Sequence, residues 1–309
     1  MKVLGIRRGL KYSPNLAGND AAIFTAVMDE LRAEGHEVST IREEEMLAQD
    51  YGAYDRVVTM ARSMATLSTL MDDLKEREDV QEKFFNSVRG AVVCMSKSLV
   101  ALQMLMSDIP QPAFRIGQDK KIIFDATNQK GKTGLRFPLW LKNSEGTATM
   151  SVDTLFCQTK KEYMEARKAY QEMGVSTWLV QDHVVGDLIK FYGVEGTGFF
   201  QWRYASKGHS KFGLEKINGP EAGYKFDAGQ VQEYAEKLAR ALEVPIYGGD
   251  AVIDEEGNIW LIDFNDFPSF SSCRERAAKA IAERVVRGKR LEVRGKKLEV
   301  IGYRDEGKD

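Results

Sequence analysis

The stretch from Gly248 to Phe270, GGDAVIDEEGNIWLIDFNDFPSF, constrains the fold more than any other part of the chain. Two β-rich segments, residues 252–254 and 259–262, flank a short polar stretch that contains Gly257, and a glycine supplies the positive φ that a tight turn usually needs. The sequence therefore predicts a β-hairpin. A turn of two or of four residues gives the same register, in which residue 254 faces 259, residue 252 faces 261, and Asp250 faces Asp263.

This register brings three oxygen-bearing side chains together. Asn265 lies two residues beyond Asp263 and therefore on the same face of its strand. Two carboxylates directly opposed, at roughly 5 Å, repel each other and need a compensating charge. A hard divalent cation such as Mg²⁺, or Mn²⁺, accepts carboxylate and amide oxygens and keeps positions open for phosphate. We therefore predict a metal site at Asp250, Asp263 and Asn265.

The alternative is an acidic hairpin exposed to solvent. Trp260, Ile262 and Phe264 alternate with the polar residues, so we expect them to form an apolar face on the opposite side of the strand. A strand with one apolar and one polar face favours a central position in a sheet, with the polar cluster facing a site.

Composition limits the class of protein. The chain has 309 residues, of which 43% are hydrophobic, enough to bury the cores of two or three subdomains. Its formal net charge of −2 provides no overall field for nucleic acid or for an anionic membrane. No stretch approaches the roughly 18 apolar residues of a membrane span, so we expect a cytoplasmic protein. Cys94, Cys157 and Cys273 are widely spaced, and we expect them to be buried thiols.

The first 90 residues alternate between strand and helix patterns. Residues 2–6, 38–41 and 56–60 predict strands, and residues 21–34 predict an amphipathic helix that Asn19 or Asp20 caps. This order is typical of a parallel sheet, in which ligands bind beyond the carboxyl ends of the strands.

Basic residues follow two of these strands. They are candidates for binding an anionic acceptor, and the alternative is solvated surface charge. The acceptor candidates are Arg7, Arg8, Lys11 and Arg62.

The rest of the chain predicts a second and a third group of elements. Pro110 and Pro112 end a helix over residues 98–106 and mark a domain boundary. The further predicted helices cover residues 72–85, 162–173, 228–242 and 274–286. The further predicted strands cover residues 91–94, 122–124, 138–142, 150–157, 177–181, 187–192 and 198–205, with a closing hairpin over 291–301.

The order of several separated motifs resembles that of the ATP-grasp superfamily. These motifs are the Met95-Ser96-Lys97 helix entry followed by IPQP, the PLWLK segment, the VQDHVVGDLIK segment, and the final GGDAVID and LIDFNDFPSF. The resemblance covers nearly the whole chain. It implies a mixed α/β and α+β fold, with an N-terminal Rossmann-like domain (1–107), a central ATP-grasp subdomain (108–180) and a C-terminal ATP-grasp subdomain (181–309).

The resemblance also implies ATP and Mg²⁺ as cofactors and a role for each matching residue. Lys97 and Lys142 hold the phosphates, and Lys190 and Arg203 face the transferred phosphoryl group. The metal ligands are those that the hairpin register predicts. The remaining nucleotide contacts are a loop over the phosphates with Ser144, Gly146 and Thr147, an adenine segment of Gln181, Asp182, His183 and Val184, and Asp187 near the ribose.

Three activities remain open within this resemblance. We favour a carboxylate–amine ligase that forms an acylphosphate, as in glutathione synthetase or the ribosomal-protein glutamate ligases, because ligases are the commoner activity in the superfamily. Such a reaction needs no side-chain nucleophile, in agreement with the lack of a Ser-His or Cys-His constellation in the sequence. Asp263, Lys190 and the basic residues after the first strand instead favour an inositol phosphate kinase. The third is a non-catalytic nucleotide-binding regulator. The partner is then a small carboxylate, amine or phosphorylated acceptor, and a homodimer is left open.

Overall fold

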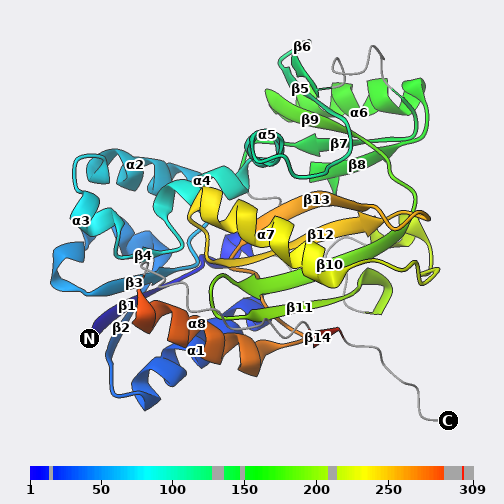
Figure 1. The fold of residues 1–309 in the computed structure, drawn as a ribbon. Helices are drawn as coiled ribbons and strands as arrows, with labels where there is room; N and C mark the ends of the chain where they lie inside the picture. Colours follow the sequence, from blue (N-terminus) through cyan, green and yellow to red (C-terminus); the bar gives the residue numbers. More distant parts are fainter. Residues whose placement is uncertain (14–16, 127–135, 147–149, 208–213, 289–300, 303–309) are drawn as a thin grey trace.

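The computed structural model describes residues 1–13, 17–126, 136–146, 150–207, 214–288 and 301–302. Within these residues the strands form three sheets, each built mainly from one part of the chain. Figure 1 shows the second sheet as an upper lobe that stands above a body formed by the first and third sheets. The predicted mixed fold with three groups of elements is confirmed, while the residue limits of the three predicted domains stay a prediction.

The first sheet is parallel, as the alternation of strand and helix patterns predicts. β1 (Lys2–Arg7) pairs with both β2 (Glu37–Arg42) and β3 (Arg56–Thr59), and β3 pairs with β4 (Phe84–Phe85). The strand order is β2-β1-β3-β4. The carboxyl ends of β1 and β3 therefore meet at one edge, where Arg8 and Arg62 follow them.

Helices cover both faces of this sheet. α1 (Ala17–Ala33) and α8 (Arg274–Arg287) lie side by side on one face, where they share a hydrophobic core that also includes β3, β4 and the start of β12. On the other face, α2 (Met64–Leu74) and α4 (Val88–Met95) enclose a second core, and α3 (Glu78–Gln81) contributes to it. The C-terminal helix thus binds the N-terminal sheet to the rest of the molecule.

Three local predictions in this region are wrong. The chain over residues 72–85 is not one helix, because α2 ends at Leu74 and the segment finishes as the short strand β4. Residues 91–94 belong to α4 rather than to a strand, since a short apolar run suits a buried helix as well as a strand. Ser87 caps α4 by accepting a hydrogen bond from the backbone N–H of Gly90 at 3.0 Å. Asn19 and Asp20 both lie inside α1, so neither caps it.

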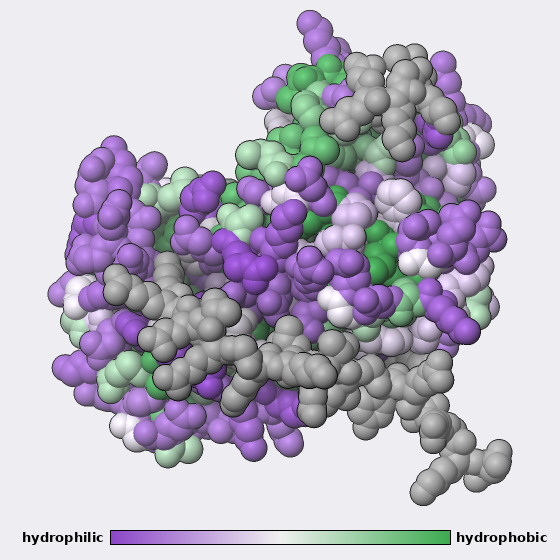
Figure 2. Space-filling view, viewed as in Figure 1, coloured by the Kyte–Doolittle hydropathy of each residue, from purple (hydrophilic) through white to green (hydrophobic). Residues whose placement is uncertain are grey.

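The second sheet is antiparallel and has the order β6-β5-β9-β7-β8. α6 (Lys160–Glu172) packs on one face through Tyr163 and Tyr170, and α5 (Lys97–Met106) packs on the other through Ala101. Figure 2 shows apolar side chains gathered over α5 and the β5–β6 hairpin. The five strands are β5 (Phe114–Gln118), β6 (Lys121–Asp125), β7 (Leu139–Asn143), β8 (Thr154–Cys157) and β9 (Thr177–Asp182).

The third sheet has the order β13-β12-β10-β11-β14. α7 (Ala228–Leu242) covers one face with the predicted stripe that includes Val231, Ala235 and Leu238, all fully buried. The opposite face of the sheet turns toward the second sheet. The strands are β10 (Asp187–Val194), β11 (Phe199–Tyr204), β12 (Ile246–Ile253), β13 (Ile259–Asp266) and β14 (Ile301–Gly302).

Short 3-10 helices connect several of these elements: η1 (Leu10–Tyr12), η2 (Glu43–Ala48), η3 (Tyr51–Ala53), η5 (Ser151–Asp153), η6 (Ala205–Lys207) and η7 (Leu214–Asn218). Residues 291–300 of the predicted closing hairpin lie outside the described residues. In the described part of the chain, no single helix has the length and apolar character of a membrane span. The pair α4 and α5 meets that test only together and is bent by 109°.

The predicted hairpin of β12 and β13 is confirmed, but β13 lies at an edge of the third sheet, so its predicted central position is wrong. The register of the hairpin also differs from the prediction near the turn. Asp250 pairs with Asp263, as predicted, whereas Ala251 pairs with Leu261 because a bulge intervenes. The predicted pairs of residue 252 with 261 and of 254 with 259 are therefore wrong. Ile262 turns toward the cavity described below, while Leu261 and Phe264 join the core beneath α7, so the predicted apolar face is wrong for Ile262.

Candidate active site

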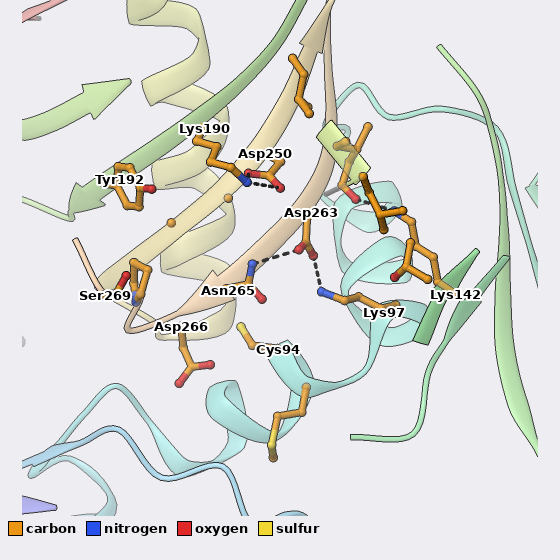
Figure 3. Close-up of a pocket in the computed structure, with 18 of the residues that line it drawn as sticks. Cys94, Lys97, Lys142, Lys190, Tyr192, Asp250, Asp263, Asn265, Asp266 and Ser269 are labelled. Atoms are coloured by element: carbon orange, nitrogen blue, oxygen red, sulfur yellow. Dashed lines mark hydrogen bonds and ion pairs between the residues drawn. The ribbon is translucent and has the colours of Figure 1, made fainter. Parts of the chain in front are cut away.

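A cavity of about 380 Å³ lies between the second and third sheets and extends to the carboxyl ends of β1 and β3. Its lining includes charged side chains from β10, β12, β13 and β7, together with Lys97 at the start of α5 (Figure 3). Residues from all three parts of the chain therefore converge on one space.

A row of four charged residues crosses the third sheet. Arg203 on β11 pairs with Lys190 on β10, Lys190 pairs with Asp250 on β12, and Asp250 pairs with Asp263 on β13. Directly paired residues of neighbouring strands point to the same face, so all four face the cavity that they line. The sheet register thus brings together the four residues that the sequence analysis assigns to phosphoryl transfer and metal binding.

Two lysines bind the two carboxylates of this row. Lys190 Nζ lies 3.2 Å from Asp250 Oδ1, and Lys97 Nζ lies 2.5 Å from Asp263 Oδ1 (Figure 3). The Lys97 pair joins α5 to β13 across 166 positions of sequence. The compensating positive charge that the opposed carboxylates require is supplied here by ammonium groups.

Asp263 is surrounded by positive charges and hydrogen-bond donors. Burial raises the pKa of this carboxyl, but the charges of Lys97 and Lys142 and hydrogen bonds from Lys97 and Asn265 outweigh burial and hold the pKa below its usual range. Asn265 Nδ2 donates to Asp263 Oδ2 at 3.0 Å. That bond fixes the amide group and leaves its oxygen as an acceptor. Asp263 is therefore an anion at neutral pH.

The donor set of this cluster suits a hard cation that also binds phosphate. Asp250, Asp263 and Asn265 offer two carboxylates and an amide oxygen, and all three line the cavity. Among the described residues no group of three or more His, Cys, Asp or Glu forms a metal site by itself. Mg²⁺ commonly binds one or two carboxylates together with substrate phosphates rather than an all-protein cage. The metal assignment remains a prediction that the chemistry of these side chains fits.

Lys142 on β7 is a buried cation in the roof of the cavity. Its Nζ donates to Gln181 Oε1 at 2.7 Å and to the backbone oxygen of Ile262 at 3.1 Å. Both acceptors are neutral, so burial dominates and lowers the pKa of Lys142 from 10.5 to about 8. Keeping this ammonium group charged inside the protein costs free energy, and such a cost is expected where a cation binds a ligand.

The segment after β7 is joined to the start of α5. Ser144 Oγ accepts a hydrogen bond from the backbone N–H of Ser98 at 2.7 Å and lies 3.0 Å from the hydroxyl of Ser96, the N-cap of α5. Gly146 lines the cavity with a φ of 92°. Thr147 lies outside the described residues, so the predicted phosphate loop is described only at its beginning.

The predicted adenine segment lies at one end of the cavity. Gln181, Asp182, His183 and Val184 all line it. Trp140 Nε1 donates to His183 Nδ1 at 3.1 Å, so the neutral ring carries its proton on Nε2. Burial lowers the pKa of His183 and keeps the ring neutral at physiological pH. With Phe156 packed edge-on against the imidazole, this end is aromatic and neutral, as a purine site requires.

Asp187 does not lie where the sequence analysis places it. Its two carboxylate oxygens accept hydrogen bonds from the backbone N–H groups of Ala222, Gly223 and Tyr224, at 2.6 to 2.8 Å. The side chain is buried and is not among the cavity lining. Asp187 therefore holds the loop before α7 rather than a ribose.

Only two of the four predicted acceptor residues line the cavity. Arg7 packs over the ring of Phe24 on α1, with its guanidinium carbon 5.4 Å from the ring centre, and Lys11 lies over the ring of Tyr12. Neither of these two side chains lines the cavity. Of Arg7 and Arg8, only Arg8 lines the cavity.

Arg8 and Arg62 already have acidic partners. Arg8 donates to Asp20 at 2.8 Å and to the backbone oxygens of Met60 and Phe267. Arg62 donates to the carboxylate and the backbone oxygen of Asp266, and the side chains of this pair are 7% and 1% exposed. The acceptor end of the cavity is therefore close to neutral.

These two acidic partners and the buried carboxylate of Glu43 were not predicted from the sequence. Glu43 accepts hydrogen bonds from the backbone N–H groups of Gly9, Arg62 and Ser63 and so holds both basic loops in place. Asp20 could have been found, because it falls on the same helical stripe as Phe24. The partner of Arg62 could not, since 204 positions separate the two residues.

Comparison with known proteins places this fold. No protein-family model matches the chain, and no curated protein matches it in sequence. Among solved structures, the D-alanine–D-alanine ligase of Bacillus anthracis complexed with ATP matches with a TM-score of 0.64 and 14% identity, covering 93% of this chain and 98% of that one. An ATP-grasp RimK domain protein from Sphaerobacter thermophilus matches with a TM-score of 0.62 and 16% identity, over 93% and 100% of the two chains.

A second D-alanine–D-alanine ligase, from Coxiella burnetii, matches with a TM-score of 0.61 and 14% identity over 93% of this chain and 96% of that one. The chain therefore has the ATP-grasp fold over nearly its whole length. The resemblance inferred from the separated motifs is confirmed at the level of the fold.

Proposed function

We propose that the protein is an ATP- and Mg²⁺-dependent ligase that joins a small carboxylate to an amine through an acylphosphate. The observation that carries this proposal is the row of Arg203, Lys190, Asp250 and Asp263 facing one cavity with the buried Lys142. Transfer of a phosphoryl group asks a protein mainly for positioning and for charges around the γ-phosphate. This cluster supplies both, without a nucleophilic side chain.

The nucleotide would lie between the second and third sheets. The neutral aromatic end at His183 suits the base, and Lys97 and Lys142 suit the phosphates. Asp250, Asp263 and Asn265 would hold Mg²⁺, which when bound neutralises phosphate charge. Lys190 and Arg203, at the other end of the row, would face the γ-phosphate and the acceptor carboxylate.

The chemistry balances without any further group. A carboxylate oxygen attacks the γ-phosphorus, and ADP leaves with the electrons of the broken P–O bond. The amine then attacks the acyl carbon, inorganic phosphate leaves, and the amine loses a proton. The protein must orient the carboxylate and exclude water while the acylphosphate exists.

The charge of the acceptor end favours a ligase over an inositol phosphate kinase. A phosphorylated acceptor needs uncompensated cations, whereas Arg8 and Arg62 are paired with Asp20 and Asp266. Arg7, which the kinase hypothesis also used, packs on Phe24 instead. A small substrate with a single carboxylate needs fewer cations, and Arg203 lines the cavity in a position to bind it.

Mass spectrometry tests the reaction directly. Purified protein is incubated with ATP, Mg²⁺ and a metabolite extract, and ADP and new masses are followed. A product equal to two metabolites joined with loss of water supports the ligase. A metabolite heavier by one phosphoryl group would make the protein a kinase. Binding of an ATP analogue with no ADP release for any acceptor would indicate a non-catalytic regulator.

A matched pair of variants separates true turnover from contaminating ATPase. Lys142→Gln removes a cation inside the cavity, and Lys237→Gln removes one from the exposed face of α7. ADP release and the new product should disappear together in the first variant and persist in the second. ADP release that persists in both would assign it to another protein.

A further inference from the structure

Lys97 and Lys190 each form an ion pair with a carboxylate, Asp263 and Asp250 respectively, that the proposed function assigns to a metal. Each pair is partly buried: the side chains of Lys97 and Asp263 are 17% and 21% exposed, and those of Lys190 and Asp250 are 18% and 27% exposed. The two ammonium groups come from different elements, α5 and β10, and approach the carboxylates from different sides (Figure 3).

Lys142 provides the internal contrast. It lines the same cavity, but its Nζ bonds to an amide oxygen and a backbone oxygen. Lys97 and Lys190 are therefore distinguished from Lys142 by their acceptors, not by their location in the cavity.

From this contrast, and resting on the proposed function, we propose that Lys97 and Lys190 form a two-lysine latch that keeps divalent metal off Asp250 and Asp263 until a nucleotide binds. A metal that reaches the protein alone must displace two charge-assisted hydrogen bonds and then sit beside the displaced ammonium groups. The phosphates of a nucleotide offer these lysines alternative anionic partners. The carboxylates then become available, so metal and nucleotide bind together.

The latch has a consequence for the order of binding. A lysine can leave its carboxylate without losing electrostatic stabilisation only when another anion takes the place of that carboxylate. Binding of nucleotide and of metal should therefore be strongly and reciprocally coupled, since each raises the affinity for the other. The protein selects the metal–nucleotide complex over free metal.

Electron paramagnetic resonance of Mn²⁺ tests the latch without any turnover. Free Mn²⁺ is titrated into the whole protein in the absence of nucleotide, for wild type, Lys97→Gln and Lys190→Gln. Each variant should bind Mn²⁺ roughly tenfold more tightly than wild type, because it lacks one competing charge-assisted bond. Two variants on different elements keep the test valid if one of them fails to fold.

Two controls separate the latch from a general change in charge. Lys142→Gln removes the same charge from the same cavity, and its gain in Mn²⁺ affinity should be clearly smaller than that of Lys97→Gln. Lys237→Gln on the exposed face of α7 should leave the affinity unchanged. Equal gains in Lys142→Gln and Lys97→Gln would overturn the latch.

Wild type with a non-hydrolysable ATP analogue distinguishes the two proposals. If the complex of protein and analogue binds Mn²⁺, while Lys97→Gln and Lys190→Gln match wild type without nucleotide, the latch is wrong and the metal assignment stands. If no protein-bound Mn²⁺ is found even with the analogue, the metal assignment fails, and the latch fails with it.

Discussion

The buried Lys142 should make the stability of the protein depend on pH in a predictable direction. Its pKa is about 8 in the folded protein and near 10.5 in the unfolded chain. Each pKa unit corresponds to about 1.4 kcal/mol, so the charged form destabilises the fold by roughly 3 kcal/mol at neutral pH. Between pH 8 and 10.5 the unfolded chain binds more protons at this site, so stability rises with pH in that window.

Replacing Lys142 with methionine isolates this effect. The variant leaves Gln181 Oε1 without its lysine partner at every pH, so that loss cancels when two pH values are compared. What remains is the titration of the ammonium group. Relative to the variant, wild type should gain about 2 to 3 kcal/mol of unfolding free energy between pH 7 and pH 10.

Urea unfolding followed by tryptophan fluorescence measures this difference, with EDTA present to remove metal. Lys237→Met, at an exposed lysine on α7, is the control and should follow wild type at both pH values. A gap between wild type and Lys142→Met that is the same at pH 7 and pH 10 would refute the reasoning, because it would mean that Lys142 is solvated or paired in the folded protein.

Three further predictions concern packing, the buried ion pair and the metal. A Cβ at Gly90 would lie 2.2 Å from a backbone oxygen, so Gly90→Ala should lower the unfolding free energy by about 1 to 3 kcal/mol. A Cβ at Gly18 in α1 would meet no atom within 4 Å, so Gly18→Ala should raise the unfolding free energy by about 0.5 to 1 kcal/mol. Arg62→Met leaves Asp266 buried and unpaired and should cost about 3 to 5 kcal/mol in urea unfolding, most of which Asp266→Leu in the same chain should restore. Asp263→Asn should abolish Mg²⁺-dependent ADP release, and full turnover in that variant would disprove the metal assignment.

The register of the hairpin shows what could be predicted from the sequence and what could not. The prediction of Asp250 opposite Asp263 is right, yet it rests on two errors that cancel. Ile253 pairs with Ile259, so the turn has five residues and shifts the register by one position. The bulge at Ile262 adds one residue to β13 and shifts the register back. Alternation of side chains cannot reveal a bulge, because the segment is apolar on both sides of it.

The ion pairs of the site could be predicted only in part, for a different reason. Strand alternation tells which face a residue takes, so Lys190 and Arg203 could be placed beside Asp250 once their strands were recognised. The partner of Asp263, by contrast, comes from α5, and the position of that helix over β13 depends on how the sheets pack. Local patterns carry no information about such contacts between elements.

Two opposed carboxylates do need positive charge, but a lysine supplies it as well as Mg²⁺ does. Around these two carboxylates the cavity places four cationic side chains: Lys97, Lys142, Lys190 and Arg203. The cluster is thus net positive before any metal binds, which disfavours a free divalent cation and favours an anion. A nucleotide triphosphate with about four negative charges reverses this balance, so the site can accept the metal and the nucleotide together more readily than the metal alone.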